Sequence, residues 1–313
     1  GPRRRRRSPE HRRQRPPPRL VPLDPAMNTG GRDRTGAAVL FMLGSSLGFA
    51  LMGACVRWAG DVPLAQKVMM RNVVMAALAG AWVARDGLPD PVWRWRPHSW
   101  RVVLRSLSGL LGVACYFYAI ERLTLADATI LNKLSPFFVM LFAARFLREK
   151  LTRPLVAALL LGFTGALLVI KPRFDVSVVP AVVGAASAVF AAAAYTLERS
   201  LKGLEPPHRI IFWFAMVSTV ATAPFALPAW QTPSPGQWLA LLGIGLGAAV
   251  GQFGLTHGLQ LAPASRISIL NYTNIVMAML VGWLAWREFP DGWSLAGAAL
   301  IIGAAVWSQT ARR

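Results

Sequence analysis

The residues of this sequence that could do chemistry are three cations inside long apolar stretches. Lys133 lies in ATILNKLSPFFVM (128–140), and Lys67 and Arg71 lie four residues apart within 64–84. A charge at the bilayer centre costs about 2.5–3.5 kcal/mol on translocon scales, so a lysine or arginine there usually faces a water-filled cavity. Arg71 and Lys133 therefore predict a site for an anionic or carboxylate-bearing substrate; the alternative for Arg71 is a structural ion pair or contacts with backbone carbonyls. Lys67 lies close to a helix end, where snorkelling to water is the preferred interpretation and a substrate role the alternative.

A proline next to Lys133 adds polar groups at the same depth. Pro136 has no N–H, so the carbonyl of Asn132, four residues earlier, loses its helical hydrogen bond. Asn132 then offers an amide side chain and a free carbonyl beside the Lys133 ammonium. Asn271 and Tyr272 occupy the corresponding positions later in the chain. We predict that these four residues bind substrate; the alternative is that the two asparagines brace helix contacts.

Other polar and aromatic side chains within apolar stretches are further candidates for substrate binding. Aromatic rings could stack on a substrate, although such rings more often serve packing, and His257 could accept a proton near neutral pH. These candidates are Tyr116, Tyr195, Trp213, Gln252 and His257. The carboxylates fall at the ends of the predicted helices or between them, which disfavours a carboxylate relay for ion coupling. The remaining mechanisms are exchange of one substrate for another, facilitated movement of the substrate, and a mechanism linked to His257.

An intramembrane enzyme is the main competing class of function. GSSLG (44–48) matches the G-x-S-x-G pattern, but that motif needs a strand before its serine, and here it lies in a predicted helix. His11, His98 and His208 lie outside the predicted spans, so neither a Ser–His pair nor a metal cluster is expected. We predict a protein that is not an enzyme and that needs no cofactor.

The elements that must position these residues are membrane helices. The chain has 313 residues, of which 54% are hydrophobic and 15% charged, and its mean hydropathy is +0.43. Segments of the roughly 20 residues that cross a bilayer recur without charge. We predict an all-α polytopic membrane protein with ten helices, at 35–57, 64–84, 101–120, 125–146, 154–171, 178–198, 209–228, 237–260, 266–286 and 292–311. The glycines at 243, 247, 251, 254 and 258 are read as close helix packing.

The first 26 residues contribute +7 of the net charge of +20, as nine arginines against Glu10 and Asp24, in an Arg/Pro block that cannot bury a core. We therefore expect no nucleic-acid partner, and we treat residues 1–34 as a disordered basic tail. Gly1-Pro2 is read as the remnant of a cleaved tag and Met27 as the natural start; the alternative is a basic arm that contacts anionic lipid. Cys55 and Cys115 lie in apolar spans. We interpret them as buried packing residues rather than as a disulfide.

An internal repeat divides the remainder of the chain. LADATILNKLSPFFVMLFAARFLREKL, from Leu125, aligns without gaps on ASRISILNYTNIVMAMLVGWLAWREFP, from Ala264, and pairs Asn132 with Asn271 and Arg148-Glu149 with Arg287-Glu288. The halves are 35–174 and 175–313, with five helices each. Because five is odd, the second half enters the membrane inverted. Placing both termini in the cytoplasm puts the cation-rich connections inside, as the positive-inside rule requires.

The repeat and its closing motifs resemble the EamA family of the drug/metabolite transporter superfamily, over about residues 35–311. The second half departs from the first in having Ile275 where Pro136 stands. The resemblance implies a ten-helix inverted-repeat fold, a central substrate cavity built by both halves, and alternating access by rocking of the halves. It also implies peripheral fifth and tenth helices that often support homodimers.

We therefore predict a secondary transporter of a small organic metabolite in a bacterial inner membrane, with membrane lipid around it. The alternatives are a lipid flippase or scramblase, or an exporter of amino acids or amphiphilic drugs.

Overall fold

The computed structural model describes residues 31–86, 94–146, 153–170, 178–201, 204–205, 207–261 and 268–310, and these ranges are helical with no strand. Residues 1–30 of the predicted tail lie outside them, whereas 31–34 belong to the first helix. The helices are α1 (Gly31–Trp58), α2 (Leu64–Asp86), α3 (Ser99–Arg122), α4 (Leu125–Asn132), α5 (Ser135–Phe146), α6 (Arg153–Ile170), α7 (Val179–Ser200), α8 (Pro207–Ala226), α9 (Pro235–Leu261), η3 (Ser268–Tyr272), α11 (Thr273–Trp286) and α12 (Gly292–Thr310).

These helices form the ten predicted passes, and two of the passes are broken. The fourth pass divides into α4 and α5 at Lys133–Leu134, just before Pro136, as expected where a proline removes a helical hydrogen bond. The ninth pass begins as the short 3-10 helix η3 and continues as α11, although Ile275 replaces the proline there. The two breaks place Lys133 and Asn271 at helix ends, where backbone polar groups are not all used in regular helical hydrogen bonds.

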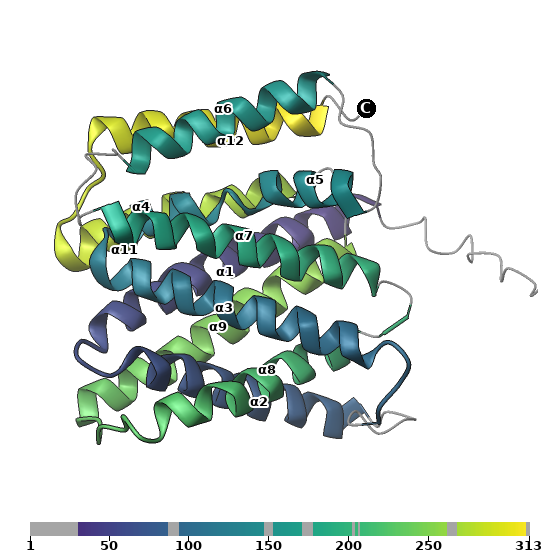
Figure 1. Ribbon diagram of the computed structural model, residues 1–313, viewed down its shortest axis with the longest axis vertical. Helices are drawn as coiled ribbons and strands as arrows, with labels where there is room; N and C mark the ends of the chain where they lie inside the picture. The colour runs from purple at the N-terminus through teal and green to yellow at the C-terminus, as the bar shows by residue number, and fades with distance from the viewer. Residues whose placement is uncertain are drawn as a thin grey trace, which may run out of the picture.

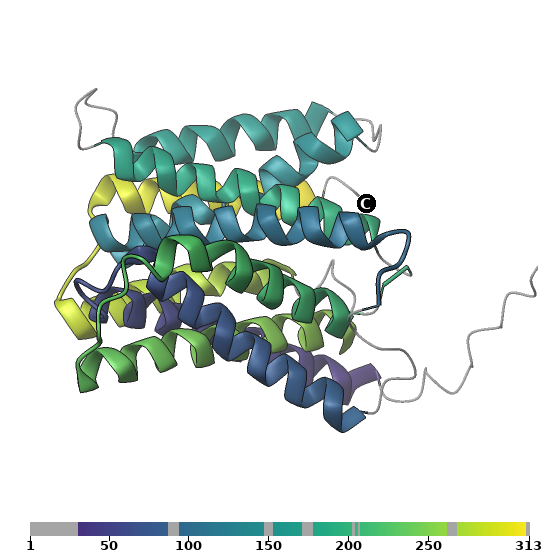
Figure 2. The same cartoon turned by 60° about the horizontal axis from the view of Figure 1, so that its bottom comes forward.

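The length and direction of the helices fit a membrane protein. Six described helical spans are long and apolar enough to cross a bilayer, and three shorter helices are also apolar. Figures 1 and 2 show the helices running side by side, with their connections gathered at two opposite ends. We call these the α1–α2 end, on the left of Figure 1, and the α7–α8 end, on the right. Helix α1 begins and helix α12 ends at the α7–α8 end (Figure 1). The protein is an integral membrane protein.

The packing partners of the helices follow the internal repeat. The first pass, α1, packs on the eighth, α9, and correspondingly the sixth, α7, packs on the third, α3. The second and seventh passes, α2 and α8, pack on each other, as do the fifth and tenth, α6 and α12. In Figure 1 the α6–α12 pair lies at one side of the bundle. Exchanging the two halves leaves this pattern unchanged, as expected of a duplicated five-helix unit.

Glycines allow α1 and α9 to approach closely. A Cβ atom on Gly247 would lie 2.8 Å from the carbonyl oxygen of Gly48 and 2.9 Å from the backbone nitrogen of Met52. A Cβ on Gly254 would lie 2.7 Å from the carbonyl oxygen of Phe41. The packing interpretation of these α9 glycines is confirmed. Both Cys55 and Cys115 are free thiols, so the two cysteines do not form a disulfide.

Candidate substrate site

A cavity of about 120 Å³ lies between the two halves of the bundle. Its walls come from eight of the ten passes, and none of its lining residues belongs to α6 or α12. The lining residues are Phe49 and Met52 of α1, Arg71 of α2, Arg105, Gly109, Gly112, Val113 and Tyr116 of α3, Asn132 and Lys133 at the end of α4, Ala191, Ala194 and Tyr195 of α7, Phe214 of α8, Gln252 and Leu255 of α9, Asn271 of η3, and Asn274 of α11.

Lys133 is a buried cation on this cavity, and a neutral amide holds it. Its Nζ donates a hydrogen bond to Oδ1 of Asn271, at 3.0 Å. The repeat-related Asn132 instead donates from Nδ2 to Oγ of Ser187 in α7, also at 3.0 Å. Among the described residues, no carboxylate forms an ion pair with Lys133. The two equivalent asparagines thus have different partners, and only Asn271 orients the ammonium.

A second cationic part of the cavity contains two guanidinium groups on one aromatic ring. The Cζ atoms of Arg71 and Arg105 lie 5.4 and 4.6 Å from the centroid of Phe214, within the range of cation–π attraction. Arg105 pairs with Glu198, whose carboxylate lies 2.8 Å from Nη2. Arg71 donates to Oδ1 of Asn72 at 2.7 Å, and no described carboxylate pairs with it. Of these two buried guanidiniums, only that of Arg105 therefore has a described carboxylate partner.

We did not predict Arg105 as a site residue. It lies near the start of the third pass, so we counted it with the cations of the loop before that helix. It lies six residues inside α3 and is buried. The signal that could have revealed it is spacing: Arg105, Gly109, Gly112 and Tyr116 follow one another by four, three and four residues and share one helix face. Phe214 and Asn274 also line the cavity without having been predicted.

The remaining predicted residues on the cavity are Tyr116, Tyr195 and Gln252. The hydroxyl of Tyr116 shares a hydrogen bond of 2.9 Å with Oγ1 of Thr129, which fixes the orientation of the phenol ring. Tyr195 remains 45% exposed, so its ring borders open space rather than packed side chains. The structure thus brings seven of the ten predicted residues to one cavity.

The other three predicted residues lie away from the cavity lining. Tyr272 is buried in an apolar cluster, and its hydroxyl has no hydrogen-bond partner among the described residues. Trp213 packs edge-on against Trp95, with ring centroids 6.1 Å apart. The ring of His257 lies 5.6 Å from that of Phe41, centroid to centroid. Their surroundings in this structure are packing environments.

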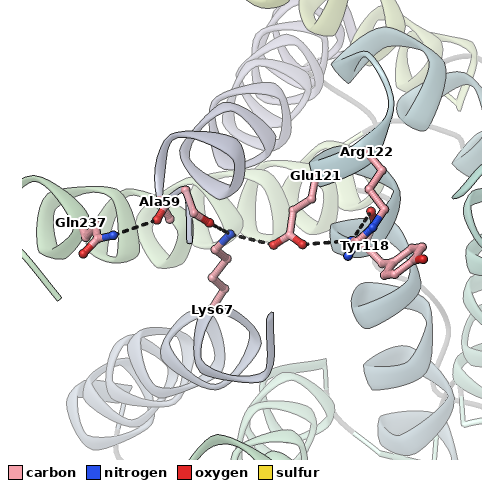
Figure 3. Close-up of polar contacts among 7 residues, drawn as sticks. Ala59, Lys67, Tyr118, Glu121, Arg122 and Gln237 are labelled. Atoms are coloured by element: carbon pink, nitrogen blue, oxygen red, sulfur yellow. Dashed lines mark hydrogen bonds and ion pairs between the residues drawn. The ribbon is translucent and has the colours of Figure 1, made fainter. Parts of the chain in front are cut away.

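The preferred interpretation of Lys67 is wrong, because its ammonium does not reach water. Figure 3 shows Lys67 extending from α2 toward Glu121 of α3. Its Nζ lies 2.7 Å from Oε1 of Glu121 and donates to the carbonyl oxygen of Gly60 at 2.8 Å. The Lys67 side chain is 1% exposed and that of Glu121 is 21% exposed. An ammonium excluded from water needs a counter-charge, and Glu121 supplies it. Lys67 does not line the cavity.

Ion pairs join the two halves at each end of the bundle. At the α1–α2 end both guanidinium nitrogens of Arg57 contact the carboxylate of Glu288. At the α7–α8 end Arg105 pairs with Glu198, and Arg96 lies 3.3 Å from the carboxylate of Glu205. The cavity therefore lies between two sets of charged contacts that link the first half to the second.

The serine of the GSSLG motif makes contacts between helices. The Oγ of Ser46 accepts a hydrogen bond from Oγ1 of Thr273 at 2.8 Å and donates one to the carbonyl oxygen of Leu270 at 3.4 Å. Asn274 donates to the Ser46 carbonyl at 2.9 Å. Ser46 thus ties α1 to the broken ninth pass.

The sequence and fold are similar to those of known transporters. The EamA-like transporter family matches residues 36–171 and again residues 179–309. The pseudopaline exporter CntI of Pseudomonas aeruginosa is 35% identical over 284 residues, which cover 88% of this chain and 96% of that protein. A riboflavin transporter of Rhizobium johnstonii is 29% identical, covering 88% of this chain and 91% of the relative. One solved crystal structure has the same fold, with 22% identity, a TM-score of 0.66, and coverage of 89% of this chain and 99% of its own. The chain is thus a transporter and not an enzyme, and it belongs to the EamA-like transporter family.

Proposed function

We propose that this transporter moves a small organic metabolite with at least one negative charge, and that it does so by alternating access. The observation that carries the proposal is the charge of the cavity. Arg71, Arg105 and Lys133 line it, whereas Glu198 is the one described carboxylate that forms an ion pair with any of the three. Among the described residues, Arg71 and Lys133 are thus two buried cations without an anionic partner.

An anionic substrate would supply the missing partner. A buried charge without a counter-charge is unfavourable, and the attraction between opposite charges strengthens where water is excluded. Neutral amides around the cations, including those of Asn132, Asn271 and Gln252, can accept or donate hydrogen bonds and orient a polar substrate. A neutral or cationic substrate would leave the positive charge uncompensated or increase it.

The two-fold packing pattern supports alternating access. The cavity lies between halves that are joined by ion pairs at both ends, so access from either side requires one set to separate. We place the α7–α8 end and both termini in the cytoplasm, because the cation-rich connections lie there. The name of the Pseudomonas aeruginosa relative, an exporter, favours export from a bacterial inner membrane. A homodimer through the peripheral α6–α12 pair stays a prediction.

The test is transport by purified protein in liposomes, with panels of dicarboxylates, amino acids, organic phosphates and quaternary amines. We expect uptake of an anion that is lost in Lys133→Ala and Arg71→Ala and kept in Arg153→Gln, which changes an exposed cation at the start of α6, outside the cavity lining. Anion transport that survives both alanine substitutions would refute the charge argument. Translocation of labelled lipid without transport of any panel member would instead show a flippase or scramblase.

A further inference from the structure

We propose that the Arg71–Arg105 pair binds a carboxylate of the substrate in exchange for Glu198, so that loading the substrate breaks an ion pair between the halves. The substrate class that fits is a dicarboxylate, with its second carboxylate on Lys133. This inference rests on the proposed function, because it assumes an anionic substrate in the central cavity.

The first observation is that Glu198 uses only part of the donor capacity of the arginine pair. Its Oε2 receives hydrogen bonds from Nη2 of Arg105 at 2.8 Å and from Nε at 3.3 Å. Nη1 of Arg105 and Nε of Arg71 are buried and have no hydrogen-bond partner among the described residues. Both guanidiniums lie against Phe214 on the cavity wall. The pair thus has donor capacity beyond what one glutamate uses.

The second observation is the unequal burial of the two partners. The Arg105 side chain is 6% exposed, whereas that of Glu198 is 40% exposed. A carboxylate that is already partly hydrated can move into water at little cost, but a buried guanidinium cannot lose its counter-ion without a replacement. Exchange of Glu198 for a substrate carboxylate therefore keeps Arg105 paired throughout.

The third observation is the position of Glu198 in the fold. Ala191, Tyr195 and Glu198 follow one another at four and three residues in α7, so they share one helix face, and the first two line the cavity. Arg105 belongs to the first half and Glu198 to the second. Release of Glu198 would remove a contact between α3 and α7 at the α7–α8 end, which couples the arrival of substrate to separation of the halves.

The exchange also defines specificity. Lys133 lies on another wall of the same cavity and is held by the neutral Asn271. A dicarboxylate can pair with Lys133 and with the arginines at once. A monocarboxylate satisfies only one of the two subsites, so it either leaves the arginine pair with Glu198 or leaves Lys133 without an anion.

The experiment measures the apparent Tm of the purified, detergent-solubilised protein during titration with malonate, succinate, glutarate and adipate. Butyrate and 1,5-diaminopentane are the comparison probes at equal ionic strength. A ligand that binds only the folded state stabilises it by RT ln(1 + L/Kd), where L is the ligand concentration, so the dependence of Tm on L yields an apparent Kd. We expect at least one dicarboxylate to bind at least about tenfold more tightly than butyrate, since it gains a second charge-assisted contact.

The decisive variant is Glu198→Gln, which removes the competing carboxylate. We expect the Kd of the bound dicarboxylate to fall about two- to fivefold, the contribution of an ion pair with one exposed partner. Glu198→Asp keeps the charge with a shorter reach and should give a smaller gain. Glu288→Gln is the matched control, because it breaks the ion pair between the halves at the opposite end without removing a carboxylate from Arg105, and its Kd should change less than that of Glu198→Gln.

Three results would overturn the inference. Equal affinities in Glu198→Gln and Glu288→Gln would show that Glu198 does not compete with the ligand. Weaker binding in Glu198→Gln would show that Glu198 positions Arg105 instead. Both outcomes leave the proposed anion transport intact. If none of the four dicarboxylates raises the Tm of wild type while a neutral or cationic compound is transported, both the inference and the anionic substrate are wrong.

Discussion

Removing the counter-ion of Lys67 should destabilise the fold more than removing Lys67 itself. Truncating one partner of a buried ion pair typically costs about 3–5 kcal/mol, because the other charge stays buried and unpaired. Glu121 is 21% exposed, and Lys67 keeps its hydrogen bond to Gly60, so we expect Glu121→Gln to cost less, about 2–3 kcal/mol. In Lys67→Met the remaining Glu121 still has Arg122 at 3.3 Å, which limits the loss to about 1 kcal/mol.

The double variant tests the physical reason for this asymmetry. Lys67→Met combined with Glu121→Gln contains neither charge, so it should be about as stable as Lys67→Met alone. The coupling free energy of the cycle would then be about 2 kcal/mol. These substitutions remove contacts that Figure 3 draws, where the ammonium of Lys67 lies between the α1–α2 turn and Glu121.

The assay is thermal unfolding of the four proteins in the same detergent and at one scan rate, since membrane-protein unfolding is often irreversible. A loss of 2–3 kcal/mol corresponds to a fall in apparent Tm of about 3–5 °C for a chain of this size, from an unfolding entropy of about 2.1 cal/mol/K per residue. The reasoning is refuted if Glu121→Gln unfolds at the wild-type temperature, or if the double variant is less stable than both single variants.

Three further substitutions test other contacts by the same unfolding assay. Gly247→Val should lose at least about 1–3 kcal/mol, because its Cβ would meet backbone atoms of α1. Gly303→Ala, where no atom lies within 4 Å of the added Cβ, should be neutral or slightly stabilising, and equal behaviour of the two glycine variants would count against close α1–α9 packing. Arg57→Gln should cost no more than about 1 kcal/mol and less at high salt, since its side chain and that of Glu288 are 25% and 30% exposed; a larger, salt-independent loss would contradict this. Tyr272→Phe should be neutral or stabilise by up to about 1 kcal/mol, because its buried hydroxyl has no described partner, and a clear loss would reveal a hydrogen bond.

Much of the site could be predicted because a buried polar group is conspicuous in an apolar segment. Lys133, Arg71 and the asparagines stand out against the hydrocarbon-compatible residues around them, and the structure places all four on the cavity. Arg105 was missed because a cation near a helix end is ordinary in a membrane protein; its partner on α7 and its burial show that it belongs to the site.

The sequence by itself determined the number of passes, the duplicated halves and the helix break near Pro136, because hydropathy, prolines and repeats are properties of the chain read locally. Only the tertiary structure decided which face of each helix meets the cavity. In lipid the outward and inward faces of a helix are both apolar, so hydrophobic periodicity does not define its rotation as it does in a soluble bundle. That rotation brings Arg105 and Phe214 beside Arg71, pairs Lys67 with Glu121, and turns Tyr272 into an apolar cluster.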